Sequence, residues 1–145
     1  MVIELLILIF ILWIFAGGFY SPQKGEQYKL SKIRSSLEKI TSSLGYYHTH
    51  TYNIVADSQR SHVVDKYEIH LLLTNPKTGQ FFDEMTLLDV ALHEMAHVIC
   101  PEEGHGQQFE TIYFSLRQKA CKLGYLEWDF APDEDYPCMD DDEED

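Results

Sequence analysis

The sequence is poor in basic residues and in cysteine. Only 11 Lys and Arg stand against 24 Asp and Glu, which gives a formal net charge of −13. The basic residues do not form a stripe with aromatic ones, so direct nucleic-acid binding has no support, although contact with DNA through another protein remains open. The three cysteines, Cys100, Cys121 and Cys138, form no CxxC pair, which fits a reducing compartment better than a disulfide framework.

The acidity is concentrated at one end of a short chain. At 145 residues the sequence can form one domain with a modest core, and a second full domain does not fit. Nine of the acidic residues lie between 133 and 145. We therefore expect residues 131–145 to form an acidic disordered tail, with docking to a partner as the sharper alternative.

A long apolar run opens the chain. Residues 5–20, LLILIFILWIFAGGFY, contain no charge, and a helix of this length just crosses roughly 30 Å of hydrocarbon. We expect residues 1–20 to form a hydrophobic N-terminal membrane anchor, with a cleaved signal peptide or a helix of a soluble protein as alternatives. The basic residues that follow predict a single-pass membrane protein with its domain on the cytoplasmic side: Lys24, Lys29, Lys32 and Arg34.

Hydrophobic spacing between residues 28 and 130 predicts three helices and a small sheet. Residues 21–27, SPQKGEQ, are typical of a linker. Apolar residues then recur at helical spacing over 30–44, 88–99 and 109–123, and the second of these helices ends before Pro101. The segments 47–56 and 66–73 are rich in β-branched and aromatic residues, and turn residues follow at 74–79. We expect about three strands, antiparallel at least in part.

The strongest indication of a catalytic site is the motif HEMAH at residues 93–97. Because residues four apart on a helix lie on the same face, His93 and His97 can share one ion. Glu94 lies on a neighbouring face, where its carboxylate can reach a water at the metal without becoming a ligand. This spacing favours a catalytic metal site over a helix that merely carries polar residues.

A catalytic zinc ion takes three protein ligands and keeps one position open, so the chain must supply a third ligand. His105 follows the helix after a turn and lies between Gly104 and Gly106, whose missing side chains allow tight backbone paths. We predict that Zn²⁺ is bound by His93, His97 and His105, with Glu94 as the general base. Other ligands remain open as alternatives: Cys100, Glu102, Glu103 and Glu110.

Several further residues are candidates for supporting roles. Asp89 could accept the outer N–H of a ligand imidazole, or it could serve the start of the helix as an acidic residue. Tyr113 and Tyr125 could donate a hydrogen bond to an oxyanion, with core packing as the alternative for Tyr113. The remaining histidines are interpreted as surface or strand residues rather than ligands: His48, His50, His62 and His70.

The stretch LLDVALHEMAHVICPEEGHGQQF, residues 87–109, resembles the zinc-peptidase motif of the SprT (Spartan) and WLM families. In these families HExxH is followed at short distance by a histidine in an H-G-x-x-F or H-x-x-F/W context. The likeness covers roughly residues 28–125. It implies an α+β minigluzincin-like fold of three helices on a three-stranded sheet, with the ligands and the acid/base residue named above.

The resemblance also implies, more loosely, digestion of proteins, including proteins crosslinked to DNA. This chain lacks the basic DNA-binding segments of the repair members. Small members of this kind are encoded by large DNA viruses, and this chain is similar to them, which would place the anchor in a host membrane or a virion.

The expected function is therefore that of a membrane-anchored zinc endopeptidase acting on a protein or peptide substrate. An extended substrate would pair with the strand at 66–73, placed at the sheet edge. One alternative is a non-enzymatic membrane or virion scaffold protein in which zinc staples the domain, which a fourth protein ligand would favour. Another is a metal-dependent hydrolase that cleaves a different bond. The sequence does not indicate the oligomeric state.

Overall fold

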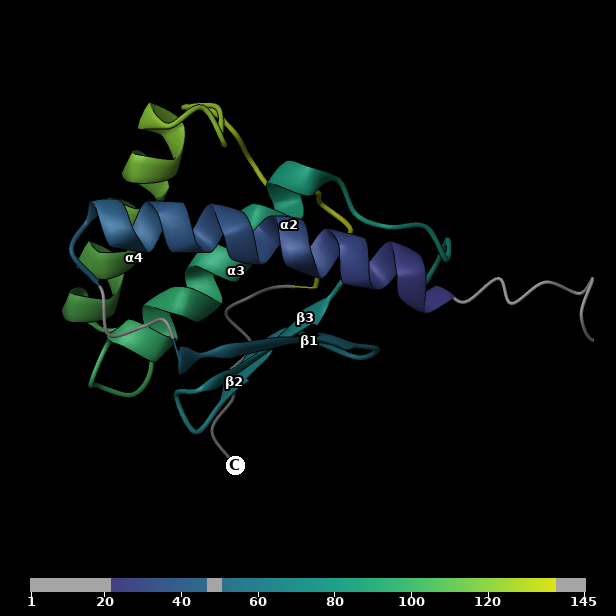
Figure 1. The fold of residues 1–145 in the computed structure, drawn as a ribbon, viewed down its shortest axis with the longest axis horizontal. Coiled ribbons are helices and arrows are strands. Elements are labelled where there is room, and N and C mark those ends of the chain that lie inside the picture. The colour runs from purple at the N-terminus through teal and green to yellow at the C-terminus, as the bar shows by residue number, and fades with distance from the viewer. Residues whose placement is uncertain (1–21, 47–50, 138–145) are drawn as a thin grey trace, which may run out of the picture.

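The computed structural model describes residues 22–46 and 51–137 and places three helices on one side of a small sheet (Figure 1). The prediction of three helices and about three strands is confirmed. The helices are α2 (Pro22–Ser43), α3 (Glu84–Ile99) and α4 (Gln107–Lys122). The strands are β1 (Asn53–Asp57), β2 (His62–Val64) and β3 (Glu68–Leu72).

The sheet is mixed, and β3 is its central strand. The strand order is β1-β3-β2, with β1 parallel and β2 antiparallel to β3. The expected partial antiparallel pairing is therefore confirmed. The expectation that the strand at 66–73 forms an edge is wrong, because β3 is hydrogen-bonded on both sides. The two edges are β1 and β2.

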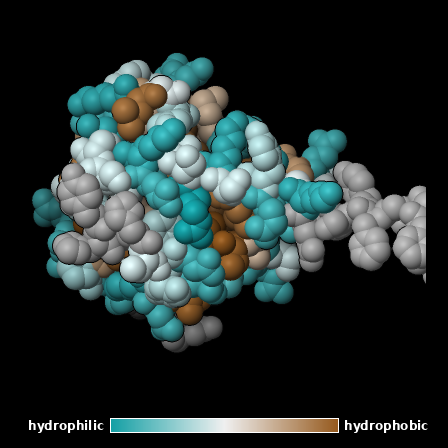
Figure 2. Space-filling model, in the orientation of Figure 1, coloured by the Kyte–Doolittle hydropathy of each residue, from teal (hydrophilic) through white to brown (hydrophobic). Residues whose placement is uncertain are grey.

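The core lies between the sheet and the helices, and α3 runs through its middle. Successive side chains of a strand point to opposite faces, and the fully buried Ile69 and Leu71 of β3 point toward the helices. α3 is buried without a break from Thr86 to Ala96, since it packs against α2, α4, β2 and β3. On the face drawn in Figure 2, hydrophobic side chains form small separate patches among hydrophilic ones. Burial in this core contributes about 1.5–3 kcal/mol for each large aliphatic side chain.

The expected membrane helix requires a correction. Within residues 22–46 and 51–137, the structure contains no helix with the length and apolar character needed to span a bilayer. The segment 1–20, which carried this expectation, lies outside the described residues. The fold is therefore a small α+β domain of three helices and a three-stranded sheet, and an N-terminal transmembrane helix is not supported as part of it.

Two expected boundaries also differ from the structure. α2 begins at Pro22, so most of the segment 21–27 is helical rather than a linker; proline is favoured in the first turn, where its missing N–H has no partner to lose. The first part of the expected acidic tail is packed on the domain. The Tyr136 side chain is buried and its hydroxyl donates to the Leu72 carbonyl oxygen at 3.1 Å, while the Asp133 N–H donates to Thr86 Oγ1 at 3.0 Å.

The start of α3 depends on Asp83. Its carboxylate accepts hydrogen bonds from the Thr86 N–H at 2.9 Å and from the Thr86 hydroxyl at 2.6 Å, which satisfies a backbone donor that the helix itself leaves unpaired. Burial raises the pKa of Asp83, but these hydrogen bonds outweigh it and hold the pKa below its ordinary value.

We expect Asp83→Ala to lower the free energy of unfolding by about 1 kcal/mol, as loss of an N-cap does. Because the folded-state pKa is depressed, the ionised Asp83 stabilises the fold at neutral pH, and this contribution is lost as the pH falls through that pKa. Urea unfolding at neutral and acidic pH measures both effects. Asp129→Ala, on an exposed carboxylate, is the control; an equal loss in the two variants would contradict the capping role.

Candidate metal centre

Three imidazoles converge between α3 and the loop that precedes α4. His93 and His97 lie one turn apart on α3, and His105 lies in the loop. The Nε2 atom of His105 is 3.1 Å from Nε2 of His93 and 3.1 Å from Nε2 of His97. Ligand atoms of all three lie within 4.8 Å of one another. A tetrahedral zinc ion with bonds of 2.0–2.1 Å holds nitrogen ligands about 3.3 Å apart, so this spacing fits one zinc ion.

The loop reaches this position through Gly104. Its φ of 76° is in the left-handed region, which glycine adopts without steric cost. Gly106 has a φ of −73° and forms the N-cap of α4, and a Cβ there would meet Glu102 Oε2 at an ordinary 3.7 Å. Of the two glycines expected to allow a tight path, the backbone geometry requires only Gly104.

The Phe109 ring packs against the imidazole rings of all three histidines. It lies in the first turn of α4, its side chain is 1% exposed, and its ring centroid is 4.9, 4.4 and 4.7 Å from those of His93, His97 and His105. Phe109 anchors α4 in the core and so fixes the loop that carries His105. Packing against a buried ring limits the orientations that the three imidazoles can take.

The environment keeps His93 neutral. Burial, followed by the positive charge that His97 and His105 can carry, lowers the pKa of His93 to about 3. A neutral imidazole offers a lone pair to a cation, whereas a protonated one does not. The donor set is therefore chemically suited to Zn²⁺.

Glu94 lies next to the three histidines without belonging to their cluster. Its side chain is 4% exposed, and its carboxylate is not among the atoms that converge within 4.8 Å. Burial chiefly raises the pKa of Tyr136 to about 12, and the negative charge of Glu94 adds to this effect. Glu94 therefore lies within electrostatic range of the segment that carries Tyr136.

Asp89 is buried on α3, four residues before His93, and contacts two partly buried side chains of α4. The carboxylate lies 2.8 Å from Arg117 Nε in an ion pair that lacks hydrogen-bond geometry, and it accepts a hydrogen bond from the Tyr113 hydroxyl at 3.1 Å. Burial raises the pKa of Asp89, and Arg117 and Tyr113 oppose that shift. The Tyr113 ring packs edge-on against His93 with centroids 5.3 Å apart, so Asp89 is hydrogen-bonded to a ring that borders His93 and does not itself contact the imidazole in the hydrogen bonds described.

The other candidates from the sequence lie elsewhere. Cys100 is fully buried in the core, and neither it nor the glutamates at 102, 103 and 110 belong to the group of converging ligand atoms. Glu103 is 92% exposed and lies 3.6 Å from Lys66. Tyr125 lines a groove with Lys29 and Met85 between α2 and α3. His48 and His50 lie outside the described residues.

Sequence reasoning did not identify Lys66, which ties the sheet to the end of α3. Its ammonium group donates to the carbonyl oxygens of His97, Cys100 and Glu102 at 3.2, 2.9 and 3.4 Å. These carbonyls lie in the last turn of α3 and just after it, where a cation is favoured by the helix dipole. Lys66 adopts a φ of 53°, which is uncommon for a residue with a side chain. Nothing in the sequence signals this contact, because it joins a turn to a helix end far along the chain.

Comparisons with known proteins identify viral relatives. The chain is 36% identical over 73 residues to uncharacterized protein 042R of invertebrate iridescent virus 3, covering 50% of this chain and 46% of that protein. It is 37% identical over 70 residues to uncharacterized protein 136R of invertebrate iridescent virus 6, covering 47% and 39%. It is 41% identical over 75 residues to uncharacterized protein R325 of Acanthamoeba polyphaga mimivirus, covering 50% and 38%.

The matched part is thus less than half the length of these viral proteins. No family model matches the chain. No solved structure matches it either.

The candidate metal centre makes a direct prediction about zinc binding. Replacing His105 by Ala should weaken zinc affinity by more than about 100-fold, the upper end of the loss caused by removing only an outer hydrogen-bond partner of a ligand. Competition with a chromogenic chelator measures the affinity. Gln107→Ala, an exposed neighbour at the start of α4, is the control. Unchanged affinity in the His105 variant would show that the third ligand is a different residue.

Lys66→Met keeps the length of the side chain and removes its charge and its donors. We expect the free energy of unfolding to fall by about 1.5–3 kcal/mol, the range for hydrogen bonds made by a charged group. Denaturant unfolding measures the change, with the exposed Lys39→Met as the matched control. If the two variants lose the same stability, the three carbonyl contacts do not stabilise the end of α3.

Proposed function

We propose that this protein is a zinc-dependent peptidase, similar to the SprT and WLM families, that hydrolyses peptide bonds of protein substrates. The observation that carries the proposal is the convergence of three imidazole nitrogens beside a buried carboxylate that is not itself part of the group. Three protein ligands leave a zinc ion one open position, which is the arrangement of catalytic sites.

Each residue of the site has a defined role in this proposal. His93, His97 and His105 would hold Zn²⁺, which when bound supplies a Lewis acid that polarises the substrate carbonyl and makes water more acidic. Glu94 accepts the proton from the attacking water and later donates it to the leaving amine nitrogen. The low exposure of His93 and Glu94, each 4%, keeps bulk water away from this proton transfer.

The mixed sheet offers an edge for an extended substrate, and that edge is β2 rather than β3. Among residues 22–46 and 51–137, β2 pairs with β3 alone and packs against α3, whereas the other edge strand, β1, packs against α2. A peptide that added to β2 through backbone hydrogen bonds would run beside the helix that carries His93 and His97. Because backbone pairing does not depend on side chains, such binding would tolerate many sequences.

In the proposed mechanism, Glu94 carries out both proton transfers, from the attacking water and to the leaving amine nitrogen. Glu94→Gln should reduce cleavage of an unfolded protein substrate by at least about 100-fold, since a positioned general acid/base contributes 10²–10⁴-fold, while one equivalent of zinc stays at the three histidines. Gel analysis with and without a chelator measures cleavage, and elemental analysis measures zinc. Glu102→Gln, an exposed carboxylate in the loop, is the control. Chelator-sensitive cleavage that persists in the Glu94 variant would reject the assigned role.

A further inference from the structure

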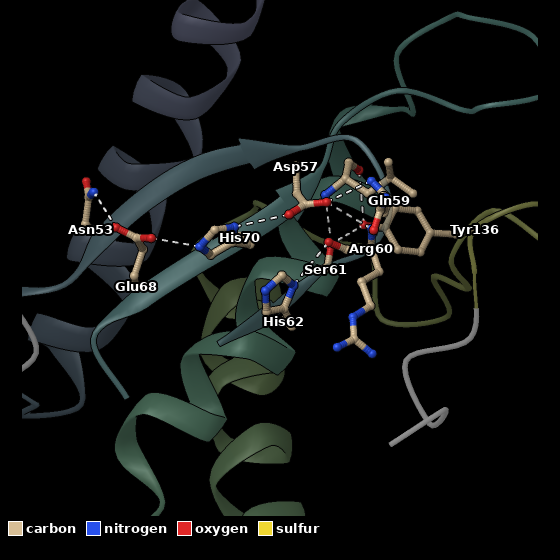
Figure 3. Close-up of polar contacts among 10 residues, drawn as sticks. Asn53, Asp57, Gln59, Arg60, Ser61, His62, Glu68, His70 and Tyr136 are labelled. Carbon is tan, nitrogen blue, oxygen red and sulfur yellow. Dashed lines mark hydrogen bonds and ion pairs between the residues drawn. The ribbon is translucent and has the colours of Figure 1, made fainter. Parts of the chain in front are cut away.

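A second group of metal-ligating side chains lies on the face of the sheet that points away from the helices (Figure 3). Ile69 and Leu71 of β3 point into the core, so Glu68 and His70, which alternate with them, point to the opposite face. There His70 meets Asp57 and His62, and one ligand atom from each of these three residues lies within 4.8 Å of the others.

Each strand of the sheet contributes one member of this group. Asp57 is the last residue of β1, His62 is the first residue of β2, and His70 lies in β3. His62 and His70 are direct partners in the antiparallel register, and their rings stack with centroids 4.5 Å apart at an interplanar angle of 24°. Stacked rings at this distance bring one nitrogen of each imidazole close enough for a single cation to bind both.

The carboxylate of Asp57 is oriented before any ligand arrives. Its Oδ1 atom accepts the backbone N–H groups of Gln59 and Arg60 at 2.7 and 3.2 Å, and its Oδ2 atom lies 3.2 Å from His70 Nδ1 (Figure 3). Burial raises the pKa of Asp57, but the two backbone donors and His70 together hold it below its ordinary value. The 3.2 Å between this carboxylate oxygen and the imidazole nitrogen is close to the separation of about 3.3 Å between two adjacent ligands of one tetrahedral ion.

The opposite nitrogen of His70 has the outer partner that metal-binding histidines usually have. His70 Nε2 lies 2.8 Å from Glu68 Oε1, and Glu68 Oε2 accepts a hydrogen bond from Asn53 Nδ2 at 3.2 Å. A carboxylate that accepts the outer N–H of a ligand imidazole fixes its tautomer and turns its other nitrogen toward the metal. Here that other nitrogen is Nδ1, which faces Asp57.

A His70 ring hydrogen-bonded between two carboxylates would also account for Asp57, His70 and Glu68. It does not account for His62, whose ring stacks on His70 and presents a ligand atom to the same point. The His62 Nδ1 atom lies 3.4 Å from the Arg60 carbonyl oxygen, which favours the tautomer with hydrogen on Nδ1 and leaves the lone pair on Nε2.

We propose that Asp57, His62 and His70 form a second binding site for a divalent transition-metal ion of the Zn²⁺ class. Two imidazoles and one carboxylate suit such an ion and leave positions for water or a further ligand. The ion would clamp the end of β1 and the start of β2 to β3, and so hold the edge strand β2 in place. This site stands apart from the three histidines of the first centre, and its existence does not depend on the peptidase proposal.

The test counts zinc ions in the full chain. The metal-free protein is titrated with Zn²⁺ by calorimetry, and bound metal is measured by elemental analysis after dialysis. Wild type should bind two equivalents. His62→Ala and Asp57→Asn should each bind one, and the double variant His93→Ala with His97→Ala should also bind one. Gln59→Ala, an exposed residue of the same turn, is the matched control and should bind two.

A second measurement on the wild type covers the case in which a variant does not fold. Addition of a second equivalent of Co²⁺ should broaden the imidazole proton signals of His62 and His70 in NMR spectra. If His62→Ala and Asp57→Asn both bind as many equivalents as the wild type, the proposal is overturned, whatever the first centre binds. Sharp His62 and His70 signals at two equivalents of Co²⁺ would overturn it as well. Loss of one equivalent in the double variant His93→Ala with His97→Ala is the result expected if the first centre binds zinc. It does not bear on the second centre.

Discussion

The burial of α3 is the constraint on which the rest of the structure depends. A helix surrounded by other elements has no water to satisfy its polar side chains, so each of them needs a partner within the fold. Thr86 meets Asp83 and the Asp133 N–H, and Asp89 meets Arg117 and Tyr113. His93 faces two other imidazoles. The cluster of three histidines is thus one solution to a general requirement of this helix, and a bound cation would complete it.

The elements around α3 fix both of its ends. Asp83 caps the start, and Lys66 reaches from the turn between β2 and β3 to the carbonyl groups at the end. Because the loop carrying His105 follows directly after that end, Lys66 also restrains the path by which the third imidazole arrives. Phe109 restrains the same loop from the other side. The position of His105 therefore depends on contacts from the sheet and from α4 as well as on its own glycine turn.

Local patterns in the sequence predicted the parts of this structure that depend on local physics. Helical spacing gave three helices, because a helix buried on one face must repeat its apolar residues every three or four positions. The four-residue spacing of His93 and His97 placed both on one face for the same reason. The order of the strands, the central position of β3, and the meeting of Lys66 with α3 are different, because they depend on contacts between residues far apart in the chain.

The same distinction explains why the second cluster was not foreseen. His62 and His70 are interpreted as ordinary strand residues when each is considered alone, and only the antiparallel register brings their rings together. Asp57 comes from β1, the strand that pairs in parallel with the other side of β3. No spacing rule along the chain marks such a group, whereas HExxH lies within a single turn of helix.

The packed segment around Tyr136 has a consequence for how the chain can be shortened. The Tyr136 ring lies 4.6 Å from that of Phe82, and its hydroxyl contacts Ser61 and the Leu72 carbonyl oxygen. A chain that ended before this tyrosine would lose these contacts and expose the end of β3 to water. This position lies within electrostatic range of Glu94. A shortened chain that keeps these contacts therefore has to include Tyr136, well past α4.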